Sequence, residues 1–504
     1  MTRTGIVYLV GAGPGDPELL TIKGKRLLQA AEVVVFDRLV DARTLALARP
    51  DAEMIDVGKV PGDPKNRQED ITAILIAKAK EGKNVVRLKG GDPYVFGRGG
   101  EEALGLVAEG LPFQEVPAPS SAVVAPAYAG IPVTHRGLAT SVTFVTGNED
   151  PTKAHSTVNW DAVANTGGTV VVLMGRDNLH RITNRFIQAG RSADTPAALV
   201  RWGSEPAQRT LTGTLYDIAA RADDAALPPP VVLVIGDVVK LRPSLNWFES
   251  LPLFGKRVLI TRTRQQAGVL SARLAALGAL PIEVPTIEIE SLPSEALDRA
   301  IDGIATYDWV AFTSANAAEI FFDRLTELGH DARALGQLKI AAIGPATVAA
   351  IKLRGIIADA VPTNYVGEAL GEALAEHDIS GKRVLLPRAA DGRDAVVTSL
   401  TALGATVDDV PTYRTVTPAN SAELLERALS DGIDIATFTS SSTVTNLMAL
   451  IDNRKQLRSV TIACIGPVTA ETAGEHRLSV DIVASESTVD GLVDALVAHF
   501  NPTT

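Results

Sequence analysis

A glycine-rich loop near the N-terminus and an acidic residue after it form the first pattern that could bind a ligand. An apolar run at residues 6–10 leads into the sequence GAGPGDP at residues 11–17, and Asp37 follows the next apolar run. Glycines let backbone N–H groups approach a ligand closely. In a dinucleotide-binding turn, Asp37 would bind a ribose hydroxyl. However, Asp16 stands where that fingerprint has its third glycine, and Pro14 removes a backbone N–H donor. A nicotinamide-dependent dehydrogenase and a purely structural turn both remain open.

Hydroxyl side chains recur in the second half, each between an apolar run and a helix-like segment. Hydroxyls and the N–H groups of a helix N-terminus can hold carboxylates there, although each hydroxyl could equally be a plain N-cap. The candidates for binding an anionic substrate are Thr313, Ser314, Asn316, Ser440, Ser441, Gly466 and Thr469.

The elements that must position these residues are short, β-branched strands alternating with helix-like patterns. This rhythm predicts α/β layers with largely buried strands. The strands are predicted at residues 6–10, 32–36, 84–88, 141–145, 170–173, 231–235 and 256–260. The segment 246–255 interrupts the pattern, so we expect the main domain boundary there.

The second half repeats itself. The sequence GKRVLITR at residues 255–262 returns as GKRVLLPR at 381–388, and AFTSA at 311–315 returns as TFTSS at 437–441. A third element, AAIGPAT, returns as ACIGPVT at 463–469. Ordered matches at so long a spacing indicate a duplicated α/β lobe, because solenoid repeats are far shorter. Two similar lobes predict a cleft.

Composition narrows the class of protein. The 504 residues carry a net charge of −11 and 46% apolar residues, which favours folded domains over a nucleic-acid scaffold or an anionic membrane surface. No apolar run reaches the length of a membrane span. The single Cys464 cannot form an intrachain disulfide, and we expect a cytoplasmic protein. Since Ala342 occupies the equivalent position of the repeat, Cys464 is interpreted as a core residue.

Several rare motifs follow the glycine loop in a fixed order. They are VFDRLV at residues 35–40, VGK at 57–59, RLKGGDP at 87–93, FGRGGEE at 96–102, GIPVTH at 130–135, MG at 174–175 and WF at 247–248. In this order they resemble the tetrapyrrole methylases, most closely the uroporphyrinogen-III C-methyltransferases, over about residues 4–248. The resemblance implies transfer of two methyl groups from S-adenosylmethionine to uroporphyrinogen III, giving precorrin-2. It also implies two α/β lobes with the cofactor between them, and a homodimer through this half.

The same resemblance assigns residue roles. Asp37 would be the general base and Lys59 the general acid, although Asp37 could merely cap a strand end and Lys59 could bind a substrate carboxylate. Arg98 and Arg136, with Arg87 and Lys89, could bind propionates or lie in solvent. The cofactor site would comprise Pro14, Gly90, Gly91, Asp92, Val95, Ser120, Ser121, Met174 and Gly203. The chain departs from the family pattern at residues 60–64 and 118–119.

The second half resembles the uroporphyrinogen-III synthases, which close hydroxymethylbilane into uroporphyrinogen III. The resemblance rests on the repeated FTS and IGP elements, TNYVG at residues 363–367 and VPTYRT at 410–415. It implies two α/β lobes joined by a two-stranded connection, expected at residues 282–287 and 409–413, and no cofactor. Tyr413, whose equivalent in the repeat is Ile287, would assist loss of the hydroxyl group or else pack in the core.

Together these patterns predict a bifunctional α/β enzyme acting on small-molecule tetrapyrroles, with no metal. The methyltransferase would span residues 1–245, in lobes of about 1–117 and 122–243, followed by a linker at 246–254. The synthase would span 255–504, with lobes of 255–287 plus 412–504 and of 288–410. A non-catalytic bilobed sensor is the alternative from another class, besides the dehydrogenase.

Overall fold

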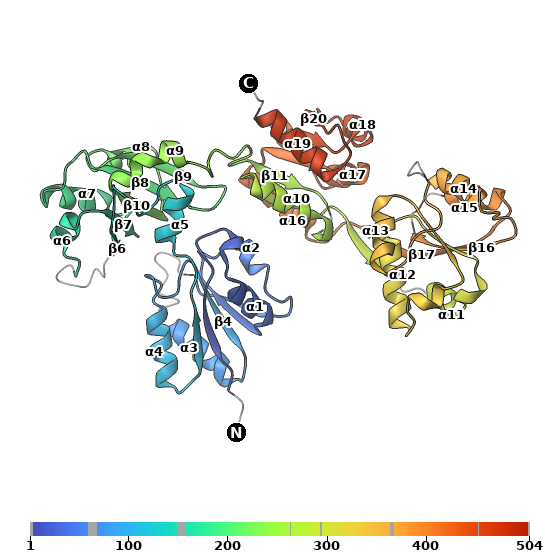
Figure 1. Cartoon of the computed structure of the whole chain (residues 1–504), viewed down its shortest axis with the longest axis horizontal. Helices are drawn as coiled ribbons and strands as arrows, with labels where there is room; N and C mark the ends of the chain where they lie inside the picture. Colours follow the sequence, from blue (N-terminus) through green and yellow to red (C-terminus); the bar gives the residue numbers. More distant parts are fainter. Residues whose placement is uncertain are drawn as a thin grey trace. The chain divides into compact units, whose positions relative to one another are not determined.

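The computed structural model describes residues 4–58, 68–148, 157–262, 264–292, 295–362, 367–390, 392, 394–451 and 453–501. Lys59 and the altered segment 60–64 lie outside these residues, as does most of the TNYVG motif. The chain divides into two compact units: unit 1 comprises Met1–Arg257, Leu274–Leu280 and Phe500–Thr504, and unit 2 comprises Val258–Arg273 and Pro281–His499. Both units have the predicted α/β class (Figure 1). All seven predicted strands are present within one residue of their expected ends.

The first sheet of unit 1 is parallel and carries the glycine-rich loop at the end of its strand β1. Val and Leu dominate its three central strands because helices cover them, and Val7, Val33 and Val85 are fully buried. The strand order is β3 (Glu53–Asp56), β2 (Val33–Phe36), β4 (Val85–Lys89), β1 (Val7–Gly11) and β5 (Phe113–Val116). Its helices are α1 (Ile22–Ala30), α2 (Ala42–Leu45), α3 (Gln68–Lys80) and α4 (Gly99–Ala108).

The second sheet of unit 1 is mixed. Strand β10 lies between β7 and β8 and runs antiparallel to both, whereas β6 and β7 are parallel. The strand order is β6 (Val142–Thr146), β7 (Thr169–Leu173), β10 (Val231–Ile235), β8 (Pro196–Arg201) and β9 (Arg209–Thr214). Its helices are α5 (Ser121–Tyr128), α6 (Trp160–Asn165), α7 (Leu179–Gln188), α8 (Ile218–Asp224) and α9 (Arg242–Leu245).

The stretch predicted as a linker is packed against unit 1. Tyr128 of α5 contacts Trp247 and Phe248, with ring centroids 5.0 and 4.8 Å apart. Phe248 continues to Phe254 at 5.3 Å, and Leu253 is fully buried. Aromatic burial of this kind fixes a segment, so these residues extend the first unit.

Unit 2 contains two further sheets, as the internal repeat predicts. One has the order β12 (Leu280–Glu283), β11 (Arg257–Ile260), β18 (Ile435–Phe438), β19 (Thr461–Cys464) and β20 (Ile482–Val483). The other has the order β13 (Glu288–Ser291), β17 (Thr406–Val416), β16 (Arg383–Ala389), β14 (Trp309–Phe312) and β15 (Lys339–Ala342). Arg273 of α10 pairs with Asp490 of α19, so these two helices lie side by side although more than 200 residues separate them in sequence (Figure 1).

In the part of unit 2 that the structure describes, ten α-helices accompany these sheets. They are α10 (Arg264–Ala276), α11 (Glu295–Asp302), α12 (Ala315–Glu327), α13 (Pro345–Leu353), α14 (Gly367–Ala375), α15 (Ala395–Ala402), α16 (Ser421–Asp431), α17 (Ser441–Leu450), α18 (Pro467–Glu475) and α19 (Val489–Phe500). Among the described residues, no helix is long and apolar enough to cross a membrane.

The two-stranded connection lies a few residues later than predicted. Strand β13 pairs antiparallel with the end of β17, with Glu288 opposite Val416 and Ser291 opposite Tyr413. The sequence alone put this pair at residues 282–287 and 409–413, because the repeat marks equivalent positions but not where they hydrogen-bond. Cys464 lies fully buried in β19, and burial raises the pKa of its thiol to about 11, which suits a core residue.

Candidate active sites

Unit 1 contains a cavity of about 310 Å³ lined by loops from both of its sheets. One wall follows β1 and β4 of the parallel sheet, and the other follows β7, β8 and β10 of the mixed sheet. Seven of the nine predicted cofactor residues line it: Pro14, Gly90, Gly91, Val95, Ser121, Met174 and Gly203. Sequence reasoning missed other lining residues, including Leu39, Phe96 and Trp202, although Leu39 and Phe96 lie within motifs that it had singled out.

The glycines shape this cavity. The N–H of Gly91 donates to the carbonyl of Gly13 at 2.8 Å, which ties the glycine-rich loop to the end of β4. Gly91 has a φ of +73°, and a Cβ built there would meet only the Ser121 nitrogen, at 3.9 Å. Open space at that point means that a ligand can lie directly on the backbone. The cavity therefore fits a cofactor held largely by main-chain groups.

The other two predicted cofactor residues support the wall without lining it. The Asp92 carboxylate is buried and accepts hydrogen bonds from the N–H groups of Tyr94, Val95 and Ala118. Ser120 is the N-cap of α5 and accepts from the N–H of Ala122 at 3.2 Å. Both residues hold lining loops in place, which is the common role of Asp and Ser at turns and caps.

Contacts across the cavity join the glycine-rich loop to the mixed sheet. The N–H of Asp16 donates to Ser204 Oγ at 3.1 Å, and the Tyr128 hydroxyl donates to Asp16 Oδ2 at 3.0 Å. A Cβ at Gly15 would lie 2.6 Å from Glu205 Cγ. Burial, together with the nearby Asp41, raises the pKa of Glu205 to about 7. Glu205 thus packs against the glycine-rich loop. It belongs to the same segment as Trp202 and Gly203, which line the cavity.

Asp37 follows β2 and adjoins the cavity. Its Oδ1 accepts from the N–H of Leu39 at 3.3 Å, and its Oδ2 lies 3.4 Å from Arg87 Nη2. A Cβ at Gly90 would be 3.6 Å from Asp37 Oδ1. The carboxylate is partly exposed, with 28% of its side chain accessible. It is therefore placed to meet a ligand in the cavity as well as to cap the strand end.

A buried ionic cluster lies behind Asp37, and sequence reasoning missed it. Glu102 Oε1 is 3.3 Å from Arg87 Nε and 3.0 Å from Lys89 Nζ, and it accepts from Gln68. All three charged groups are at least 96% buried. Burial, and then the charge of Arg87, lowers the pKa of Lys89. The expectation that Arg87 and Lys89 lie in solvent is wrong, because both are buried and pair with Glu102. Propionate binding by these two residues stays a prediction.

The two remaining basic candidates lie at the surface. Arg98 has a positive φ of 58° at the N-terminus of α4 and pairs with Glu101 at 2.6 Å. Arg136 is exposed between His135 and Ala139, which form an isolated bridge. Neither lines the cavity, so the structure does not bring them together with Asp37.

Unit 2 has a cavity of about 450 Å³ beside the β13–β17 connection. It is lined by Tyr413, Asn316 and Ser440, among the predicted residues, together with Arg262. The Tyr413 ring is buried in the hydrophobic core, and its hydroxyl lies 3.0 Å from Ser314 Oγ. Tyr413 thus packs in the core and also borders the cavity, so both interpretations of it apply.

The predicted residues of unit 2 that carry hydroxyls lie at or beside helix starts, and two of them, Ser314 and Ser440, cap a helix. Ser314 accepts from the N–H of Ala317 at the start of α12, and Ser440 forms a capping box with Thr443 at the start of α17. Ser441 accepts from the Thr472 hydroxyl at 2.7 Å. Gly466 is the N-cap residue of α18, Thr469 is buried inside that helix, and Thr313 directly precedes the cap of α12. Among these, only Ser440 lines the cavity.

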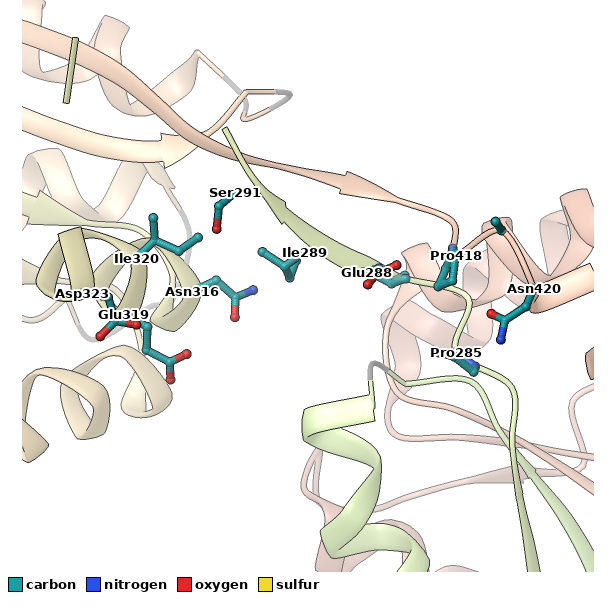
Figure 2. Close-up of a pocket in the computed structure, with 12 residues that line it drawn as sticks. Pro285, Glu288, Ile289, Ser291, Asn316, Glu319, Ile320, Asp323, Pro418 and Asn420 are labelled. Atoms are coloured by element: carbon teal, nitrogen blue, oxygen red, sulfur yellow. The ribbon is translucent and has the colours of Figure 1, made fainter. Parts of the chain in front are cut away.

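A second cavity of about 570 Å³ adjoins the cavity beside Tyr413 and shares Ile287, Ile289 and Asn316 with it (Figure 2). Figure 2 shows Glu319 and Asp323 on α12 and Glu288 on β13 around it. Three carboxylates in its lining disfavour an anionic ligand. The cavity beside Tyr413 has no acidic residue among its described lining residues.

The folds and cavities together define a two-part α/β enzyme with one site in each unit. Residues 6–219 match the family of Tetrapyrrole (Corrin/Porphyrin) Methylases, and residues 268–494 match Uroporphyrinogen-III synthase HemD. The chain belongs to the family of fused tetrapyrrole methylases and uroporphyrinogen-III synthases, since it is 39% identical to the porphyrin biosynthesis protein HemD of Ruminiclostridium josui over 98% of each chain.

Relatives of the first half alone are also similar. An S-adenosyl-L-methionine-dependent uroporphyrinogen III methyltransferase of Methanosarcina barkeri is 52% identical over 48% of this chain and 95% of its own. The crystal structure of uroporphyrin-III C-methyl transferase from Thermus thermophilus, complexed with S-adenyl homocysteine, is 42% identical, with a TM-score of 0.41. It covers 47% of this chain and 100% of its own.

Gly91→Val is expected to weaken S-adenosylmethionine binding by at least about tenfold, because its side chain would enter the open cavity. The measurement is calorimetric titration. The control is Gly110→Val, which has a similar φ of +67° and nothing within 4 Å of its Cβ. Equal losses in the two variants would assign the effect to backbone strain and would refute the placement of the cofactor.

Glu205→Gln is expected to change how stability depends on pH. Because the native pKa of Glu205 is raised to about 7, its contribution is present below its ordinary pKa and is lost as pH rises through about 7. The melting temperature of the wild type should therefore fall more than that of Glu205→Gln between about pH 5 and pH 8. Glu109→Gln, at an exposed ion pair with Lys80, is the control. Parallel pH profiles for all three proteins would contradict this role.

Proposed function

We propose that the chain is a bifunctional enzyme of tetrapyrrole biosynthesis. Its synthase half cyclises hydroxymethylbilane to uroporphyrinogen III, and its methyltransferase half transfers two methyl groups to that product, giving precorrin-2. The observation that carries the proposal is the cavity of unit 1, where seven residues assigned to the cofactor by motif line one space. Similarity to a fused relative over almost the whole chain supports the pairing of activities.

S-adenosylmethionine is the methyl donor and supplies an electrophilic methyl group on a sulfonium. Gly90, Gly91 and Gly203 would hold it against the backbone, and Met174, with its side chain partly exposed in the cavity, would contact it. A pyrrole carbon that gains a methyl group becomes tetrahedral and cationic, so a nearby base must accept a proton. Asp37 is suited to that role because Arg87 and the N–H of Leu39 orient its carboxylate beside Gly90. Lys59, the proposed general acid, lies outside the described residues.

The synthase half would act mainly by shape. Hydroxymethylbilane also cyclises unaided to the uninverted isomer, so the enzyme must select the route to isomer III. Holding the reacting atoms in the right geometry can lower the activation barrier of that route by on the order of several kcal/mol. The cavity beside Tyr413 offers hydroxyls, an amide and a phenol for this purpose. The Tyr413 hydroxyl, held by Ser314, would assist departure of the terminal hydroxyl group.

Two further features remain predictions from the family resemblance and the sequence: a homodimer through the methyltransferase half and a cytoplasmic location. A dehydrogenase is not favoured, because both halves of the chain match tetrapyrrole enzymes. A non-catalytic sensor would bind tetrapyrroles without converting them. The decisive assay is incubation with hydroxymethylbilane, with and without S-adenosylmethionine. Uroporphyrinogen III without the donor and precorrin-2 with it would support the proposal, and binding without product would support the sensor.

Asp37→Asn should slow methyl transfer by about 100- to 10,000-fold, because the amide keeps the shape but cannot accept a proton. Cofactor affinity should change little. The measurements are single-turnover rates from uroporphyrinogen III and calorimetric binding of the donor. Asp56→Asn is the control, since Asp56 ends the neighbouring strand and caps the N–H of Gly58. Loss of donor affinity in step with rate would make Asp37 a binding residue instead.

Tyr413→Phe should slow uroporphyrinogen-III formation by about ten- to a hundredfold, the value of one lost proton donor or stabilising hydrogen bond, while isomer III remains the main product. The assay is isomer analysis after oxidation to the porphyrin. Tyr307→Phe is the control, because Tyr307 is similarly buried and donates to Asp408 at 2.6 Å. Complete loss of isomer III with substrate still bound would overturn the account based on shape.

A further inference from the structure

Arg262 is a half-buried arginine in the cavity beside Tyr413. It lies two residues after the end of β11 and lines the cavity with Ser440 and Asn446. Among the residues that the structure describes, no hydrogen bond or ion pair engages its guanidinium. Burial lowers its pKa, and no described carboxylate offsets that effect. A partly desolvated cation without a protein partner is costly unless a ligand neutralises it.

The internal repeat supplies a comparison within the same chain. Arg388 occupies the equivalent position, at the end of GKRVLLPR. Its Nε lies 2.6 Å from Asp409 Oδ1, its Nη2 lies 3.0 Å from Asp394 Oδ1, and its Nη1 donates to the carbonyl of Gly392 at 2.8 Å. These partners raise the pKa of Arg388. This copy of the arginine is therefore neutralised by the protein and holds its own loop in place.

The first copy lacks both carboxylate partners. The position equivalent to Asp394 is Gly268, which has no side chain. The position equivalent to Asp409 is Glu283, which is exposed and accepts a hydrogen bond from Ser271 instead. The same scaffold thus presents one arginine that is internally paired and one that faces a cavity.

The charge of the surroundings indicates what Arg262 could bind. No acidic residue stands among the described residues that line its cavity, and the hydroxyls of Thr439, Ser440 and Ser442 are among those in the lining. The adjoining cavity, which shares Ile287, Ile289 and Asn316 with it, is lined by Glu288, Glu319 and Asp323. An anion would accordingly prefer the side of Arg262. Guanidinium groups bind carboxylates through two parallel hydrogen bonds, which fix orientation as well as adding affinity.

We propose that Arg262 binds a side-chain carboxylate of the linear tetrapyrrole and thereby sets how the chain lies in the synthase cavity. The inference rests on the proposed synthase activity and names a substrate contact within it. Arg262 is a binding residue here, so its loss should raise KM far more than it lowers kcat.

The test uses the full-length chain and three variants. Arg262→Gln should raise the KM for hydroxymethylbilane by about 10- to 100-fold, the loss expected for a charge-assisted pair, and kcat should fall less than about fivefold. Arg262→Lys keeps the charge but not the two-pronged geometry and should recover part of the loss. Arg333→Gln is the matched control, because Arg333 is 92% exposed and pairs only locally with Asp331. Thermal unfolding of every variant reports whether unit 2, which carries Arg262, is folded, and methyl transfer from added uroporphyrinogen III reports the same for unit 1.

The outcomes separate the two claims. An unchanged KM in Arg262→Gln, in a chain whose wild type forms uroporphyrinogen III, would overturn the role of Arg262 alone. A fall in kcat at unchanged KM would also overturn it. A wild type that does not convert hydroxymethylbilane would overturn the proposed synthase activity. A raised KM that Arg262→Lys does not restore, together with a lowered melting temperature of unit 2, would show misfolding and contradict the assignment.

Discussion

The parallel pairing of strands is the constraint on which both candidate sites depend. Because parallel neighbours end at the same edge of a sheet, the loops after β1, β2 and β4 converge. This brings the glycine-rich loop, Asp37 and Gly91 to one rim although up to about 80 residues separate them in the chain. In unit 2, β11 and β18 are also parallel neighbours, and the residues that follow their ends, Arg262 and Ser440, line one cavity.

Burial of charge is the second constraint. Glu102 lies fully buried between Arg87 and Lys89, two cations on β4. An isolated buried charge would be strongly destabilising, so the three groups must remain together. Their net positive charge faces Asp37 through Arg87, which connects the core of the parallel sheet to the carboxylate at its edge. The packing of α4, which carries Glu102, therefore bears on the geometry of the proposed base.

The sequence predicted those features that depend on local pattern. Continuous apolar runs located the strands, since a strand that is covered on both faces must be apolar throughout. The glycine loop and the serines at helix starts were also visible, because the backbone sets their geometry locally. The mixed order of the second sheet was not visible, since β8 and β10 pair across more than 30 residues. The Glu102 cluster and the exact pairing of β13 with β17 depend likewise on contacts between distant residues, which no local pattern encodes.

Duplication shows which residues the scaffold requires and which it leaves available for other roles. Ser314 and Ser440 cap equivalent helices in both lobes, so capping alone explains why a serine is present at each. Three of the differences are informative: Ala342 against Cys464, Ile287 against Tyr413, and the partners of Arg262 against those of Arg388. Cys464 differs within the core and remains buried. The other two departures, Tyr413 and the unpaired Arg262, both border the same cavity. The fold accepts Ile287 where the other copy has Tyr413, and it neutralises Arg388 with carboxylates of its own. It therefore needs neither the phenol of Tyr413 nor the unpaired guanidinium of Arg262 for stability. Their presence together at one cavity is best explained by what the cavity binds.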